Sequence, residues 1–287
     1  MWPVLWRIPL PFGLPAIPLH SFGVMIALGF LAASALGTRY VRRFSAEPEE
    51  DARKLNDLSV WVLFGAILGA RLLYVFVHPE EFEGRWIEVL FLWKGGLVFY
   101  GGFLAAVAVG LWRVRRLGMD LWNTADLCLA AGWLGLGIGR IGCLLVGDDY
   151  GSLAPEGTPF PIAIRVPDPI PPDAQWDSES AGRLVYATQL YLSANGFLLA
   201  GLARWMLPRR RFRGQVVWTS TALYCVTRSA IECLRGDDVA RGVLDLPEGF
   251  PLLRGLSTSQ AISIPLFLLS LYMLRRLRRR GEGPPQP

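Results

Sequence analysis

The sequence predicts an all-α, polytopic membrane protein with about seven transmembrane helices. Hydrophobic residues make up 52% of the 287 positions, and the mean hydropathy is +0.35. A helix needs roughly 20 apolar residues to cross about 30 Å of hydrocarbon at about 1.5 Å per residue. Seven apolar stretches come close to that length: residues 21–40, 57–77, 96–113, 121–138, 184–206, 215–234 and 258–275.

Clusters of basic residues follow every second apolar stretch. They lie within residues 39–54, 113–116, 209–213 and 275–280. By the positive-inside rule these loops are cytoplasmic, so the N-terminus is predicted outside and the C-terminus in the cytoplasm. Because the charge is spread over four short loops, the net charge of +5 reflects topology. We therefore expect the lipid bilayer as a partner and no nucleic acid.

The domain organisation predicted is simple. We expect a single transmembrane helical domain over residues 1–280 and a disordered cytoplasmic tail at residues 281–287. The larger outer loops are residues 78–94 and 148–182, and the prolines of the second exclude a regular helix but not a fixed extended structure. The four cysteines have no CxxC spacing, so neither a zinc site nor a disulfide scaffold is expected.

An arginine and two aspartates follow the fourth apolar stretch. A charge at the centre of a bilayer costs between about 2.5 and more than 10 kcal/mol, so an intramembrane ionisable group is a functional candidate. Nearby glycines leave backbone exposed beside Arg140 for another helix or a ligand. The planar guanidinium group suits a phosphate, as in a phospholipid headgroup. The alternative is a structural ion pair between Arg140 and Asp148 or Asp149.

The sixth apolar stretch carries Arg228, Glu232 and Arg235. At about 100° per residue, these positions, spaced i, i+4 and i+7, share one helix face. Lipid would not tolerate such a stripe, so it must face the bundle interior or a wet cavity, where Glu232 can orient Arg228. Arg235 either binds a ligand or marks the outer boundary of the membrane.

Two further polar residues lie in the second and third stretches. Arg71 is in the outer half of the second, and with Arg140 and Arg228 it suggests a pocket for an anionic substrate, open toward the external leaflet. Tyr100 enters the third stretch between two glycine pairs. Its hydroxyl either exchanges a proton with a reacting group or is hydrogen-bonded within the helix bundle.

Short motifs occur in order along nearly the whole chain, at residues 19–23, 69–71, 94–102, 139–151, 188–191, 228–235 and 256–260. They resemble those of the bacterial prolipoprotein diacylglyceryl transferase family. The resemblance implies transfer of diacylglycerol from phosphatidylglycerol to the lipobox cysteine thiol of a preprolipoprotein, with release of glycerol phosphate. It also implies action at the outer face of the bacterial inner (cytoplasmic) membrane, without a metal or cofactor.

The resemblance also assigns roles to residues. Arg140 and Arg228 match the family's essential arginines, which would bind the phosphate, and Glu232 matches their partner glutamate. We take Tyr100 and Asp148 as further candidate catalytic residues; they stand where the family usually has a histidine and a glutamate. The candidate substrate-binding residues are Phe22, Arg71, Gly142, Cys143, Gly151, Gln189 and Arg235.

Two functions remain open at this point. As an enzyme, the chain needs a base for a thiol whose ordinary pKa is about 8.5, and Tyr100, Asp148 or a headgroup oxygen would suffice. The alternative is a divergent paralogue that binds or presents phospholipid without transfer. This alternative is motivated by Phe22 and Cys143, which stand where the family usually has tyrosine and asparagine.

Overall fold

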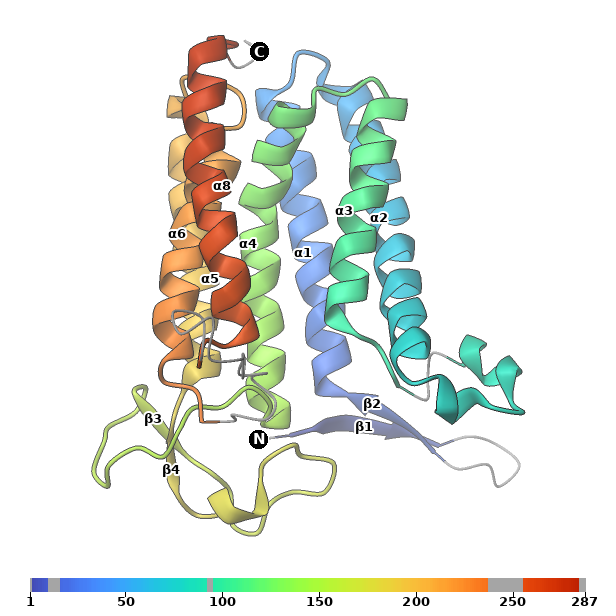
Figure 1. Cartoon of the computed structure of the whole chain (residues 1–287), viewed down its shortest axis with the longest axis vertical. Coiled ribbons are helices and arrows are strands. Elements are labelled where there is room, and N and C mark those ends of the chain that lie inside the picture. The colour runs from blue at the N-terminus through green and yellow to red at the C-terminus, as the bar shows by residue number, and fades with distance from the viewer. Residues whose placement is uncertain (1, 10–15, 92–94, 237–254, 284–287) are drawn as a thin grey trace, which may run out of the picture. The chain divides into compact units, whose positions relative to one another are not determined.

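The computed structural model describes residues 2–9, 16–91, 95–236 and 255–283 (Figure 1). Within these residues the chain is mostly helical, as predicted, and seven long helices overlap the seven apolar stretches. By length and hydropathy, α1, α2 and α4 are candidate membrane spans, while the full count of seven spans stays a prediction. The helices are α1 (Ser21–Phe44), α2 (Pro48–Val77), α3 (Phe99–Arg116), α4 (Leu121–Val146), α5 (Thr188–Met206), α6 (Gln215–Glu232) and α8 (Thr258–Arg280).

Helix α4 is longer than the sequence predicted. The predicted stretch stops at residue 138, before the charge of Arg140, whereas the helix continues to Val146. The residues after Arg140 are again mostly apolar and sustain the helix until Gly147, whose φ of +80° glycine adopts readily. Arg140 therefore projects from the last turns of a helix and not from a loop that follows it.

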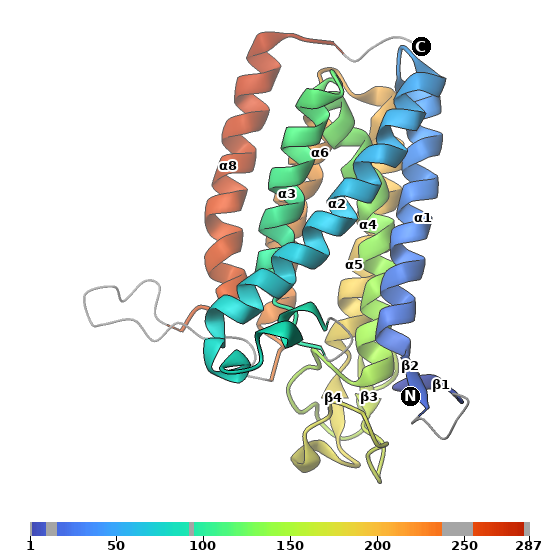
Figure 2. The same cartoon turned by 90° about the vertical axis from the view of Figure 1, so that its right-hand side faces the viewer.

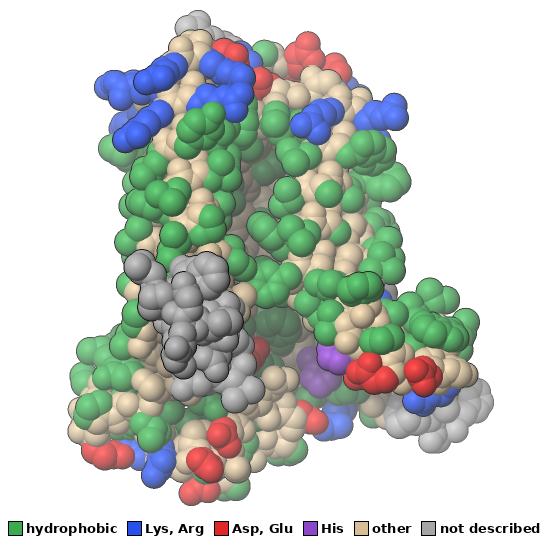
Figure 3. All heavy atoms as spheres, in the orientation of Figure 1, with side chains coloured by type: hydrophobic (Ala, Val, Ile, Leu, Met, Phe, Trp, Pro, Cys, Tyr) green, Lys and Arg blue, Asp and Glu red, His purple; other side chains and the backbone are tan. Residues whose placement is uncertain are grey.

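The two ends of α8 are set by local sequence. Ser257 and Gln260 form a capping box, in which the Gln260 backbone N–H donates to Ser257 Oγ at 3.2 Å. The helix ends at Gly281, with φ +68°, after three consecutive arginines. Figure 3 shows Lys and Arg side chains around this end and hydrophobic side chains along the helix below it. An apolar, exposed flank with a basic end is typical of a membrane helix.

Two small antiparallel sheets, which the all-α prediction omitted, accompany the helices. Strand β1 (Val4–Ile8) pairs with β2 (Ile17–His20), and β3 (Ala163–Arg165) pairs with β4 (Leu184–Tyr186). Both pairs lie in or beside proline-rich segments, where a missing backbone N–H and a fixed φ oppose a helix. The extended backbone instead pairs locally with a neighbouring segment.

The two loops predicted to lie outside contain local structure where the structure describes them. The first contains short 3-10 helices η1 (Pro79–Phe82) and η2 (Trp86–Leu90), and its last residues, 92–94, lie outside the described part of the chain. The second, residues 148–182, forms a small hydrophobic core together with the segment that leads into α5. This core consists of Ile164, Val166, Trp176, Val185 and Ala187.

The chain divides into two compact units. The first comprises Met1–Leu36 and Asp126–Pro284, and the second comprises Gly37–Ala125 and Pro285–Pro287. The single domain therefore stays a prediction. Of the predicted disordered tail, residues 284–287 lie outside the described part of the chain.

Close approach of glycines packs the helices within each unit. In the first unit, a Cβ atom at Gly29 would lie 2.8 Å from the Gly135 carbonyl oxygen, so α1 and α4 touch through their backbones. In the second, a Cβ atom at Gly101 would lie 2.4 Å from the Gly69 carbonyl oxygen, and Figure 2 shows α2 and α3 side by side. Small residues allow such contacts between helices in a membrane.

A buried ion pair joins the N-terminal parts of α4 and α6. Arg210 Nη1 lies 3.0 Å from Asp126 Oδ2, and both side chains are buried. The same carboxylate accepts hydrogen bonds from the backbone N–H groups of Gly214, at 2.9 Å, and Val217, at 2.8 Å, at the start of α6. A carboxylate at this position satisfies N–H groups that a helix leaves unpaired.

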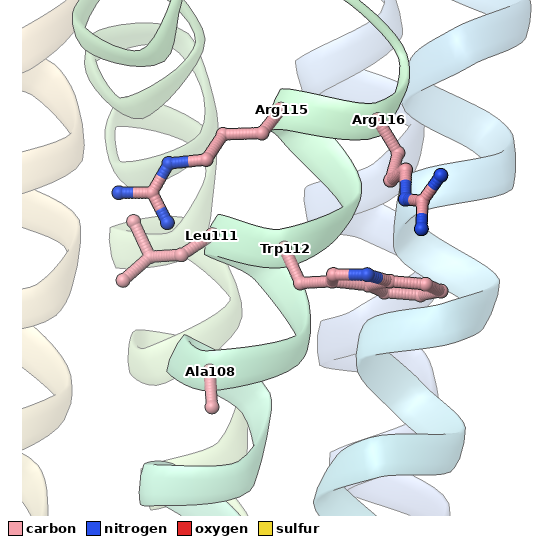
Figure 4. A pocket seen from close by; sticks show the side chains of 5 residues that line it. All are labelled: Ala108, Leu111, Trp112, Arg115 and Arg116. Carbon is pink, nitrogen blue, oxygen red and sulfur yellow. The ribbon is translucent and has the colours of Figure 1, made fainter.

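A hollow of about 530 Å³ lies beside α3, lined by Ala108, Leu111, Trp112, Arg115 and Arg116 (Figure 4). Figure 4 shows the two arginine side chains pointing to different sides of the helix. Because the guanidinium groups do not converge, the hollow is a poor receptor for a single anion. None of the residues predicted to bind substrate lines it.

Candidate active site

The candidate active site centres on a carboxylate held between two arginines. Arg140, in α4, pairs with Asp149 Oδ2, and Arg235, just after α6, lies 2.6 Å from Asp149 Oδ1. Arg235 is 5% exposed at its side chain, so it does not simply mark a solvated boundary. Of the two aspartates proposed as an ion-pair partner for Arg140, the structure selects Asp149. Two guanidinium groups thus converge on one oxyanion.

The turn after α4 aims Asp149 at the arginines. Asp149 adopts a left-handed conformation, with φ +57°, which aspartate tolerates better than most residues. The first turn of α5 fixes this conformation from the other side. Thr188 Oγ1 donates to the Asp149 carbonyl at 2.6 Å, and Gln189 Nε2 donates to the Asp148 carbonyl at 2.8 Å. Gln189, predicted to bind substrate, therefore acts here on the backbone of the site.

Gly151 brings the end of α6 to this turn. Its N–H donates to the Tyr186 carbonyl at 3.0 Å, and the next residue, Ser152, donates to the Leu234 carbonyl at 2.8 Å. A Cβ atom at Gly151 would lie 2.6 Å from Tyr186 Cβ and 2.9 Å from the Leu234 carbonyl oxygen. Only glycine fits, and the close approach places Arg235 beside Asp149.

Gly142 performs a similar role toward α1. A Cβ atom at this position would lie 3.0 Å from Met25 Cβ and 3.3 Å from Phe22 Cα. The glycine, on the turn of α4 that also carries Arg140, therefore lets α1 approach closely. Phe22 is 40% exposed, and it contributes an aromatic surface and no hydroxyl. Both residues were predicted to bind substrate, and the structure gives them at least a packing role.

A second arginine site lies on α6. Arg228 Nη1 pairs with Glu232, one helical turn later, as the spacing predicted. Arg228 Nη2 donates to Ser259 Oγ of α8 at 2.9 Å. Both Arg228 and Glu232 are buried, so the carboxylate and the hydroxyl hold the guanidinium group in one orientation. The carboxylate also offsets much of the cost of a charge at this depth.

The surroundings of the site favour an anion over a metal ion. Ligand atoms of Cys143, Asp148 and Asp149 lie within 4.8 Å of one another. However, the Cys143 sulfur is 3.8 Å from Arg140 Nη1, and Asp149 already pairs with two guanidinium groups. A cation would be repelled by those arginines, whereas a phosphate would be attracted.

The two adjacent aspartates differ in their acidity. Burial raises the pKa of Asp148, and the neighbouring charge of Asp149 raises it further. Burial alone would raise the pKa of Asp149 as well, but attraction from Arg140 and Arg235 outweighs it and lowers the pKa. Asp149 is therefore the persistent anion of the pair, and Asp148 is the group that more readily takes up a proton.

Arg71 and Tyr100 belong to the other compact unit. The Arg71 guanidinium donates to backbone carbonyl groups of Glu88 and Val89, within the loop at residues 78–94, and of Gly95 and Gly96, just after it. Tyr100 stands in the first turn of α3 and is 39% exposed. The substrate-binding role of Arg71 and the catalytic role of Tyr100 stay predictions.

The sequence did not single out two residues that the structure brings into the candidate site. Asp149 was considered only as an ion-pair partner of Arg140, and its contact with Arg235 was not foreseen. Ser259 lies in the motif at residues 256–260, which was the one signal that could have pointed to it.

Comparison with known proteins decides the family. The family model described as "Prolipoprotein diacylglyceryl transferase" matches residues 9–276. The chain belongs to this family. The resemblance inferred from the motifs is thereby confirmed, and the match spans the helices of both compact units.

Individual prolipoprotein diacylglyceryl transferases are similar over nearly their whole length. A relative named phosphatidylglycerol–prolipoprotein diacylglyceryl transferase from Geobacter sulfurreducens is 31% identical over 96% of this chain and 97% of its own. One of the same name from Thermus thermophilus is 33% identical over 93% of this chain and 96% of its own. The Xanthomonas campestris relative is 30% identical over 94% and 91%.

Proposed function

We propose that this chain transfers a diacylglyceryl group from phosphatidylglycerol to the lipobox cysteine thiol of a preprolipoprotein and releases glycerol phosphate. The observation that carries the proposal is the Asp149 carboxylate bridged by Arg140 and Arg235. A site that converges two guanidinium groups on one oxyanion has the chemistry to hold a phosphodiester. Support also comes from the family model and from the names of the relatives.

The reaction is a substitution at the carbon of the diacylglyceryl group that is bonded to the phosphate oxygen. The cysteine sulfur forms a bond to this carbon while the bond from the carbon to the phosphate oxygen breaks. The electron pair of that bond leaves with glycerol phosphate, and the thiol proton passes to a base. Arginines beside the phosphate would stabilise the negative charge that grows on the leaving group.

In this proposal Arg140, Arg228 and Arg235 bind and neutralise the phosphate. Glu232 and Ser259 act through Arg228 by fixing its guanidinium group. Asp149 occupies Arg140 and Arg235 in the absence of substrate and gives up part of its contacts when a phosphate enters. Asp148 or Tyr100 accepts the thiol proton.

We further propose a single domain that crosses the membrane with about seven spans, with the N-terminus outside and the C-terminus in the cytoplasm. Within the first unit, α8 ends in three arginines, and Arg209 to Arg213 precede α6. The positive-inside rule assigns both regions to the cytoplasm. Arg140 lies in the last turns of α4, and Arg235 lies just after the C-terminal end of α6, whereas the cytoplasmic arginines precede α6. This arrangement supports an active site toward the outer face of the inner membrane.

The direct test is incubation of the purified protein in detergent or vesicles with phosphatidylglycerol and a synthetic lipobox peptide. We expect the peptide to gain the mass of one diacylglyceryl group, with an equal amount of glycerol phosphate released. A peptide with serine in place of the cysteine is the matched control and should gain no mass. Binding of phosphatidylglycerol without either product would contradict the proposal and favour a lipid-binding protein without transfer.

The acid side of the pH–rate profile should depend on Asp148. As a base it must be ionised, and its pKa is raised by burial, so kcat should fall with acid at a pH above the usual range of an aspartate. Asp148→Asn should lower kcat by about tenfold or more and remove this acid limb. The measurement is kcat against pH with saturating lipid and peptide. An unchanged acid limb in Asp148→Asn would assign the proton to another group.

A further inference from the structure

We propose that Arg71 is a positioning residue that fixes the outer loop and the start of α3, and with it Tyr100, and that it is not a phosphate ligand. The inference deepens the proposed function, because Tyr100 is one of its two candidate bases. It concerns only the second compact unit, to which Arg71, the loop and Tyr100 all belong.

The guanidinium group of Arg71 is occupied by backbone carbonyl groups. Its Nε donates to Val89 at 2.9 Å and its Nη2 to Glu88 at 2.7 Å, both in η2. Its Nη1 donates to Gly95 at 2.7 Å and to Gly96 at 3.1 Å. These bonds use four of the five N–H groups of an arginine, so little of the planar fork remains for a phosphate.

Aromatic rings cover the remaining faces of the same group. The guanidinium carbon lies 5.2 Å from the centre of the Phe82 ring and 5.7 Å from that of Tyr74. The Arg71 side chain is buried, and its hydrogen-bond acceptors among the described residues are all backbone carbonyl oxygens. Carbonyl dipoles and ring faces therefore stabilise this cation.

The loop held by Arg71 leads directly into α3. Gly95 and Gly96 both have positive φ, +87° and +74°, and a Cβ atom at Gly96 would lie 2.7 Å from Arg71 Nη1. Two residues later, the N–H of Val98 donates to the carbonyl of Ala70 at 3.0 Å. Ala70, the residue before Arg71, thus holds Val98, the N-cap of α3. Tyr100 follows in the first turn of that helix.

Kinetic measurements distinguish a phosphate ligand from a positioning residue at Arg71. A phosphate ligand lost from Arg71 would raise KM for phosphatidylglycerol, and lysine would replace part of its charge. A lost clamp would misplace Tyr100 and lower kcat, and lysine would not help, because one ammonium group cannot reach carbonyls on two separate segments. A displacement of about 1 Å at a reacting group can reduce a rate by about a hundredfold.

The variants Arg71→Lys and Gly96→Ala test the clamp from its two sides. We expect each to lower kcat by about tenfold or more while KM for phosphatidylglycerol stays within about twofold. The double variant should be little worse than either single variant, because both break one unit. Gly84→Ala is the matched control: Gly84 also has positive φ, +73°, but has open space around it, and its kcat should remain near that of the unchanged protein.

Hydrogen exchange gives a second readout that does not require transfer. Arg71→Lys should speed exchange of the amides at residues 95–98 and leave those of the turn after α4, residues 147–151, unchanged. The transfer rate of the unchanged protein tests the proposed function separately. An absence of transfer there contradicts the proposed function and leaves the exchange result as the test of the positioning role. An increased KM in Arg71→Gln with a near-normal Arg71→Lys, or slow exchange at residues 95–98 in Arg71→Lys, would overturn the positioning role.

Discussion

Replacing Arg140 by glutamine is expected to lower the rate of diacylglyceryl transfer by at least about a hundredfold, the usual effect of removing one charge-stabilising donor from an active site. Arg140 is one of two guanidinium groups that converge on Asp149, the position where we expect the phosphate. Glutamine keeps a hydrogen-bond donor on a shorter side chain but loses the charge and the planar fork. The loss should appear mainly in kcat if Arg140 acts on the leaving phosphate.

The same substitution should also destabilise the protein, because it leaves Asp149 with Arg235 alone. Removing one partner of a fully buried pair costs about 3–5 kcal/mol. Arg140 and Asp149 retain 20% and 22% exposure at their side chains, so the cost should fall below that range. A variant that is inactive because it is unfolded must therefore be distinguished from one that is inactive at the site.

Thermal unfolding of Arg140→Gln makes this distinction. In this variant Asp149 still pairs with the buried Arg235, so we expect a folded protein that unfolds in one cooperative transition at a moderately lower temperature and does not transfer. Arg116→Gln, an exposed arginine on α3, is the control for loss of a positive charge alone. Transfer by Arg140→Gln at more than about a tenth of the normal rate would contradict the role assigned to Arg140.

Helix positions were the most predictable feature of the sequence, because long apolar stretches report directly on burial in lipid. The predicted fourth stretch stops at residue 138 because the charge of Arg140 follows it, yet α4 continues to Val146. An arginine that has a partner does not stop a helix, and the partner could not be known from the local sequence. The strands escaped prediction for a related reason, since each depends on pairing with a segment outside the local pattern.

The same contrast holds at the site. The pairing of Arg228 with Glu232 follows from helical spacing and was predicted. The contact of Arg235 with Asp149 depends on how Gly151 and Leu234 meet, which only the tertiary structure reveals. Arg71 shows a further limit: its acceptors are backbone carbonyl groups, which every residue has, so no sequence pattern marks them.

Asp149→Asn is expected to bind phosphatidylglycerol about tenfold more tightly than the unchanged protein, a difference of about 1.4 kcal/mol. In the unchanged protein, an incoming phosphate must share Arg140 and Arg235 with the Asp149 carboxylate and is repelled by it. Asparagine removes that competition and keeps a similar shape. Without lipid, however, the variant should be less stable, because two arginines then face each other without a counter-ion.

The pH dependence of stability should change in the same variant. Since the pKa of Asp149 is lowered in the folded protein, its contribution to stability is present above the pKa of the unfolded chain and is lost as the pH falls through the folded value. Asp149→Asn should therefore lose less stability on acidification than the unchanged protein. Thermal unfolding in detergent between neutral and acidic pH, with and without phosphatidylglycerol, measures both effects.

Asp148→Asn separates the specific effect from a general loss of negative charge. It removes the same charge one residue away, but among the described residues Asp148 makes no ion pair with either arginine. We therefore expect a smaller gain in lipid affinity than in Asp149→Asn, and a correspondingly smaller extra stabilisation by lipid. Equal affinities in the two variants would mean that the phosphate does not take the place of the Asp149 carboxylate, and that the two arginines serve the fold rather than the substrate.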